Sequence, residues 1–271
     1  MLRSKESSQK KTIEEYLKYL SEIIHLKMFF TWNWLKKHPE ENIKDVLRER
    51  VSIYYKTNIR TELSGPQRID FEDLEWLGYE KQIEDLFVKH INNPEAFENE
   101  ASEVFRSTIE ERAHFDFASQ SYTNGFQCGS LRYDLMEEGK DYEIIGFHIA
   151  NAIQPLSIFN DPKYLPKCFL MLMDETEKRY NSKFLQTTTW LNSLPRWLEI
   201  FPEEWQENLS EPDKNIKGHN GFWGQFINAR GTFNFKYANI LRKTTYFPFY
   251  PRKSNCSFKE MRKHLKHRYN L

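Results

Sequence analysis

The sequence predicts a mixed α/β (α+β) fold, in which a helical N-terminal region over residues 1–112 precedes a mixed β-sheet with helices on its faces over residues 113–271. Two observations lead to this prediction. Apolar residues recur at helical spacing in the first region, and short β-rich runs then alternate with helical runs in the order β-β-α-β-α-β-α. With 271 residues in all, we expect the two regions to pack as one globular unit.

The N-terminal region carries helical patterns with recognisable start and stop signals. Thr12-x-x-Glu15 is a capping box at the start of the first pattern, Gly78 is expected to break a later one, and Pro94 behind Asn93 opens the last. The polar residues 1–10 predict a frayed end, and residues 57–69 predict a loop. The predicted helices cover residues 12–38, 42–56, 70–76, 79–91 and 94–111.

The second region opens with a predicted antiparallel hairpin. Its first strand, residues 126–135, follows a turn at residues 123–125, and the Glu138-Gly139 turn joins it to the second strand, residues 142–151. If Leu135 pairs with Asp141, the numbers of facing residues add up to 276, and Cys128 faces His148.

The rest of the second region alternates between predicted helices and strands. The Asp161-Pro162 pair starts a helix, because proline in the first turn behind an aspartate cap is a favoured start. A strand over residues 184–190 and a helix capped at Asn192-Ser193 follow. The remaining predictions are a strand over residues 222–232 and helices over residues 233–245 and 258–269.

The charge composition limits the classes of partner that the protein could bind. Lys and Arg number 39, as do Asp and Glu, and the resulting zero net charge disfavours nucleic acid. The one basic excess, residues 252–268, is interpreted as a solvated helix face rather than a phosphate-binding patch. No run approaches ~18 apolar residues and no apolar signal segment follows Met1, so we expect no membrane contact and a cytoplasmic location. The three cysteines form no CxxC motif, which fits free thiols.

Polar residues gather where the predicted strands end. His148 lies near the end of one strand and is followed by Asn151 and Ser157, while Thr189 and Asn192 end the next. Because open α/β sheets bind ligands at the carboxyl ends of their strands, we expect a crevice for a small polar substrate here. His148 would act as general base; the alternative is a structural histidine bonded to a loop carbonyl.

Three further residues extend the candidate site. Gln225 and Arg230 alternate along the predicted strand 222–232, and Arg230 would bind a carboxylate or phosphate unless it forms a salt bridge. Cys128 facing His148 would form a thiolate–imidazole pair, whereas the alternative for Cys128 is a small buried hydrophobe. The histidines are scattered and no HExxH motif occurs, so we expect no metal.

A family resemblance adds an expected reaction. The element order, the Thr189-Trp190-Leu191-Asn192 run and the upstream His148-Ile149 pair make residues 125–245 similar to GNAT-like acyltransferase C-terminal domains. The resemblance implies an acyl-CoA cofactor and transfer of an acyl group to an amine. The family's pyrophosphate loop reads Gln/Arg-x-x-Gly-x-Gly/Ala, whereas residues 152–157 contain no glycine.

Two alternatives from other classes stand beside the acyltransferase. The first is a non-catalytic binding or interaction protein, whose helical N-terminal half presents a surface. The second is a thiol enzyme that uses Cys128 and His148. A strand splayed away from the His148 strand, with free backbone N–H groups, would favour acyl-CoA.

Overall fold

The computed structural model describes residues 12–58, 71–119, 127–137, 139–218 and 220–271. It has a mixed α/β fold with two small sheets. The α-helices are α1 Ile13–Lys37, α2 Ile43–Asp45, α3 Leu74–Lys89, α4 Pro94–Glu103, α5 Arg106–Ser119, α6 Tyr164–Tyr180, α7 Pro195–Leu198, α8 Glu203–Glu207, α9 Phe235–Thr244 and α10 Phe258–Tyr269. The strands are β1 Leu131–Arg132, β2 Ile144–Gly146, β3 His148–Ile149, β4 Phe184–Thr189 and β5 Arg252–Ser257. Shorter π- and 3-10-helical elements are η1 Val46–Arg50, η2 Ile53–Lys56, η4 Trp190–Ser193 and η5 Asn220–Phe226.

Helix α1 begins at the predicted capping box. The Thr12 hydroxyl accepts a hydrogen bond from the Glu15 N–H at 3.2 Å, and the Glu15 carboxylate accepts one from the Thr12 N–H at 2.9 Å. The helix ends at His38, before Pro39. Its apolar stripe is buried in a cluster with residues from the other N-terminal helices and from residues 216–247.

The predicted helix over residues 42–56 is irregular. It consists of α2, the π-helical η1 and the 3-10 helix η2, with Ser52 in the left-handed region at φ 45°. Side chains from other segments donate hydrogen bonds to the backbone carbonyls where the helix is irregular. The Lys27 amino group donates to Val51 O, and the Trp223 indole donates to Arg50 O. These outside donors replace the hydrogen bonds that a regular helix would supply.

Helix α3 contradicts the predicted break at Gly78. The helix runs unbroken from Leu74 to Lys89, and a Cβ on Gly78 would meet no atom within 4 Å. A glycine in a helix interior weakens the helix by only about 1 kcal/mol, so packing can hold it in the helix. Helix α5 likewise runs past residue 111, to Ser119.

The three-stranded sheet has the order β2-β4-β5, with β2 parallel and β5 antiparallel to the central β4. Helix α6 connects β2 to β4. Leu185 and Cys256 face each other on the inner side and are fully buried, whereas Thr188 and Lys253 face each other on the outer side and are exposed. The sheet therefore buries one face against helices, and the expectation of helices on both faces is wrong.

Strand β5 is missing from the sequence-based prediction. Its residues, Arg-Lys-Ser-Asn-Cys-Ser, lack an apolar run, and residues 252–268 were interpreted as a helix face throughout. The strand forms because a full antiparallel ladder joins it to β4 from Phe184↔Ser257 to Thr189↔Arg252. The predicted strand 184–190 and final helix 258–269 are confirmed as β4 and α10.

The predicted hairpin exists as the short pair β1–β3, but its register is different. Leu131 faces Ile149 and Arg132 faces His148, so the numbers add up to 280 rather than 276. A tight turn also shortens the first strand, because Cys128 and Leu131 exchange two backbone hydrogen bonds of 3.1 Å. Gly129 permits that turn at φ +64°, where a Cβ would lie 2.4 Å from the Cys168 sulfur.

The predicted strand over residues 222–232 is wrong. Residues 220–226 form the 3-10 helix η5, and Ile227 and Phe233 form an isolated bridge across a turn. The side chains of Phe222, Trp223 and Phe226 are all buried. Their spacing of one, three and four residues suits a helical turn better than a strand. The polar residues that alternate along the segment favour the strand prediction instead.

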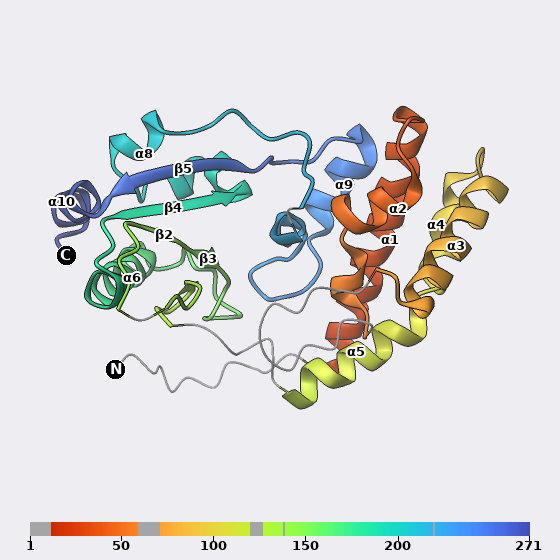
Figure 1. Cartoon of the computed structure of the whole chain (residues 1–271), viewed down its shortest axis with the longest axis horizontal. Helices are drawn as coiled ribbons and strands as arrows, with labels where there is room; N and C mark the ends of the chain where they lie inside the picture. The colour runs from red at the N-terminus through yellow and green to blue at the C-terminus, as the bar shows by residue number, and fades with distance from the viewer. Residues whose placement is uncertain (1–11, 59–70, 120–126, 138, 219) are drawn as a thin grey trace.

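Two hydrophobic clusters form the core. The first combines residues from 19–113 with residues from 216–247, and the second combines residues from 128–205 with residues from 256–265. Trp190 packs against both clusters. The core therefore does not divide at residue 112, because a C-terminal segment that includes α9 completes the helical part (Figure 1).

Some predicted elements lie outside the described residues. These are the N-terminal residues 1–10, most of the loop 57–69 and the turn 123–125. In the described part of the chain, no helix is both long and apolar enough to span a membrane.

Candidate functional site

The candidate site lies where two parallel strands separate. Strands β2 and β4 are paired from Ile144↔Phe184 to Gly146↔Gln186, and Phe147 N–H donates to Gln186 O at 3.3 Å. The chain then pairs with β1 instead, while β4 continues to Thr189 paired with β5. No ladder joins β3 to the last residues of β4 in the described structure. The Thr187 hydroxyl still donates to Phe147 O at 2.9 Å at this point.

His148 is the first residue beyond the separation. Its side chain is 54% exposed, and its Nε2 lies 3.5 Å from the Asp134 carboxylate. It is exposed because β3 continues the alternation of β2, in which Ile145 and Phe147 point inward and their neighbours point outward. His148 is therefore neither buried nor bonded to a loop carbonyl, and Asp134 is its polar partner.

Basic residues accompany His148 on the outer face of the sheet. Arg132 faces it directly across β1–β3. The β2–β4 register, continued by two residues, brings His148 level with Thr188, which faces Lys253 across β4–β5. All four side chains are exposed. The sequence-based prediction includes Thr188 among the polar residues at the strand end but omits Arg132, Asp134 and Lys253. A register sum of 280 would have placed Arg132 opposite His148.

Asn151 hydrogen bonds to two loops beside this face, one at Leu156 and one at Ala229. Its Nδ2 donates to Leu156 O at 2.8 Å and to Ala229 O at 3.0 Å, and its Oδ1 accepts from Ile153 N–H at 3.1 Å. The Ser157 hydroxyl accepts from the Phe159 N–H at 3.2 Å and so shapes the first loop. Both side chains therefore hold loops in place. Asn151 also holds Ala229, the residue before Arg230, near the end of the His148 strand.

Arg132 and Arg230 differ from the other arginines. In the described part of the chain, every other arginine side chain hydrogen bonds or forms an ion pair, as Arg48 does with Glu80 and Arg242 with Glu98. Arg132 and Arg230 do neither, and both are exposed. Arg230 follows Ala229, whose carbonyl Asn151 holds, so both unpaired guanidinium groups belong to segments that contact the β3 strand or its end.

Asn192 belongs to the core rather than to a crevice. Its Oδ1 accepts hydrogen bonds from the indoles of Trp197 at 2.9 Å and Trp205 at 3.3 Å. Its Nδ2 donates to Arg252 O at 2.8 Å and Thr187 O at 3.4 Å. The residue is fully buried, so the prediction that it binds substrate is corrected: its amide links helices to the sheet.

Gln225 and Thr189 also act within the protein. Gln225 is fully buried, and its amide donates to Phe222 O and Phe249 O and accepts from Phe249 N–H. The Thr189 hydroxyl accepts from the Leu191 N–H at 3.3 Å and caps η4. The structure therefore joins Asn151, three residues after His148, to the loop that contains Arg230, whereas the Gln225 side chain is buried.

Cys128 does not face His148. The observed register gives Arg132 that place, and the Cys128 thiol is buried in the second cluster. Burial, followed by the nearby Glu175 carboxylate, raises the pKa of Cys128 to about 12, so the thiolate is disfavoured at neutral pH. The thiolate–imidazole pair is therefore a wrong prediction.

The described residues include no cluster of three or more His, Cys, Asp or Glu side chains that could hold a metal ion. Comparisons of this chain with protein-family models, with curated proteins and with solved structures find no match.

Proposed function

We propose that the protein is an acyltransferase-like enzyme that binds acyl-CoA where β3 separates from β4 and uses His148 as general base. The observation that carries the proposal is the end of the β2–β4 ladder after Phe147, followed at once by an exposed histidine. Strand edges without a ladder partner can bind an extended amide-containing chain by backbone hydrogen bonds. The CoA arm is such a chain.

The charges around the gap support an anionic donor. Arg132 and Arg230 carry guanidinium groups that have no partner among the described residues, and Lys253 lies on the same outer face as Arg132. Guanidinium groups bind phosphate through two parallel hydrogen bonds. Because residues 152–157 contain no glycine, we assign the phosphate contacts to these side chains rather than to a backbone loop.

His148 supplies the proton transfer in this proposal. Its imidazole accepts a proton from the acceptor amine as the amine nitrogen attacks the thioester carbonyl carbon. The C–S bond then breaks, CoA leaves as the thiolate, and the proton passes from His148 to that thiolate. Asp134, whose carboxylate lies 3.5 Å from Nε2, orients the ring.

Thermal unfolding with acetyl-CoA and with CoA tests binding. A ligand at 100 times its Kd stabilises the folded state by about 2.7 kcal/mol, which raises the Tm of a chain of this size by roughly 5–10 °C. Arg132→Gln and Arg230→Gln should each reduce the rise. Arg268→Gln should leave the rise in Tm unchanged, because it removes an arginine on α10 that pairs with Glu199. No shift with any CoA compound would reject the proposal and favour the non-catalytic binding protein.

A second measurement separates catalysis from binding. Thiol release from acetyl-CoA is followed with a panel of primary amines. His148→Ala should keep the rise in Tm but lower thiol release at least about 100-fold, the contribution of a positioned base. Unchanged release in His148→Ala would remove the histidine from the mechanism.

A further inference from the structure

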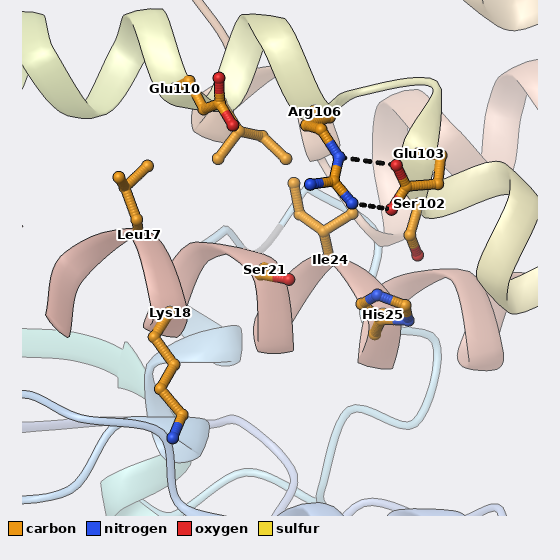
Figure 2. A pocket seen from close by; sticks show the side chains of 10 residues that line it. Leu17, Lys18, Ser21, Ile24, His25, Ser102, Glu103, Arg106 and Glu110 are labelled. Atoms are coloured by element: carbon orange, nitrogen blue, oxygen red, sulfur yellow. Dashed lines mark hydrogen bonds and ion pairs between the residues drawn. The ribbon is translucent and has the colours of Figure 1, made fainter. Parts of the chain in front are cut away.

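A cavity of about 240 Å³ lies in the helical part, between α1 on one side and α4 and α5 on the other (Figure 2). Its volume is slightly below the roughly 300–1,000 Å³ of drug-sized sites, so it suits a small molecule. Leu17, Ile24 and Ile109 provide apolar walls. The remaining lining residues are polar: Lys18, Ser21, His25, Ser102, Glu103, Arg106 and Glu110.

One end of the cavity holds a fixed imidazole. His25 Nδ1 lies 3.5 Å from the Glu98 carboxylate, which also accepts hydrogen bonds of 2.8 and 2.5 Å from Arg242. Burial raises the pKa of Glu98, but the hydrogen bonds from Arg242 and His25 outweigh it, and the pKa is lowered overall. Glu98 is therefore an anion that fixes the ring, and His25 Nε2 remains for a ligand.

The two carboxylates that line the cavity, Glu103 and Glu110, differ in their hydrogen-bonding partners. The Arg106 guanidinium is held by Glu103 through bonds of 2.6 and 2.5 Å, and the Lys18 side chain points away from these residues in Figure 2. The Glu110 carboxylate has no hydrogen-bonding or ion-pair partner among the described residues. Figure 2 shows Glu110 towards the Leu17 end, opposite His25.

We infer that this cavity binds a small organic amine with an apolar body and a hydroxyl group at its far end. The ammonium pairs with Glu110, the body packs against Ile24 and Ile109, and the hydroxyl hydrogen bonds to His25 Nε2. Leu17 and His25 are eight residues apart on α1, which is roughly 12 Å. A phenolic ethylamine with a hydrogen bond at each end has about this length. The inference does not depend on acyl transfer.

A titration of the full chain with tyramine, followed by amide NMR, tests the site. The amides of Ser21, His25 and Glu110 should shift and saturate. 4-Hydroxyphenylacetate, which has a carboxylate in place of the ammonium, should bind at least tenfold more weakly. Equal binding of the two compounds, or shifts that never saturate, would overturn the inference.

Variants locate the two polar contacts. Glu110→Gln should weaken tyramine binding about fivefold or more, whereas Glu111→Gln should not, because Glu111 accepts a hydrogen bond from Asn58 and lies outside the cavity lining. His25→Ala should weaken tyramine but not phenethylamine, which lacks the hydroxyl. Ser21→Leu, which fills the cavity from an exposed helix position, should abolish both. Unchanged tyramine binding in Glu110→Gln would contradict the assigned ammonium contact.

Discussion

Lys27 is the most unusual single residue of the helical part. It is fully buried, its amino group donates to Val51 O, and its Nζ lies 5.2 Å from the centre of the Trp223 ring. No carboxylate is within ion-pair distance of it in the described structure. Burial, followed by the charge of Lys56, lowers its pKa well below 10.5. The folded protein therefore favours the neutral amine.

This lowered pKa predicts a dependence of stability on pH. Between the folded pKa and 10.5, the unfolded chain holds a proton on Lys27 that the folded chain lacks, so the free energy of unfolding rises with pH. The slope due to this residue is about 1.4 kcal/mol per pH unit.

Urea unfolding between pH 7 and 9.5 checks the prediction. Lys27→Met should lose the slope, and Lys44→Met, at an exposed position on α2, should keep it. Parallel pH profiles for the wild type and Lys27→Met would contradict the assigned neutral state.

Asn192 shows why single residues of the site were hard to assign from sequence. An asparagine after a strand can bind a substrate or can form hydrogen bonds inside the core. The sequence does not show that two tryptophan indoles donate hydrogen bonds to Asn192. His148 is a candidate because open α/β sheets place ligands at the ends of their strands. Its partner Asp134 was missed because the assumed register lay four residues from the observed one.

At the scale of elements, prediction succeeded where local chemistry decides. The capping box at Thr12, strand β4 and helix α10 follow from caps and apolar spacing. Prediction failed where distant contacts decide. Strand β5 depends on its ladder to β4, and η5 depends on the burial of its aromatic rings in the first cluster.

Gly78 gives a test of helix propensity in α3. A Cβ there meets nothing within 4 Å, so Gly78→Ala should stabilise the protein by about 1 kcal/mol. The measurement is the midpoint of urea unfolding. Gly129→Ala is the matched contrast and should destabilise, because its φ is +64° and the new Cβ would meet the Cys168 sulfur. A loss of stability in Gly78→Ala would show that α3 needs the glycine.

At the scale of the whole molecule, the first hydrophobic cluster joins distant parts of the chain. Residues 216–247 add Trp223, Phe226 and Leu241 to the helical part, and Arg242 pairs with Glu98. A fragment of residues 1–119 should therefore lack a cooperative thermal transition, because it leaves the cluster incomplete. Adding a peptide of residues 212–251 should restore part of the transition. A fragment that melts cooperatively alone would show that the N-terminal helices are self-sufficient.

The shared cluster also governs what happens during synthesis. Residues 120–247 must still be made after α5 is complete, and at about 5–20 residues per second this takes roughly 6–26 s. During that interval α1 has no Trp223 or Phe226 to cover its apolar side. The nascent chain thus exposes an apolar helical surface on the ribosome. We expect chaperones to bind this surface until the last quarter of the chain has emerged.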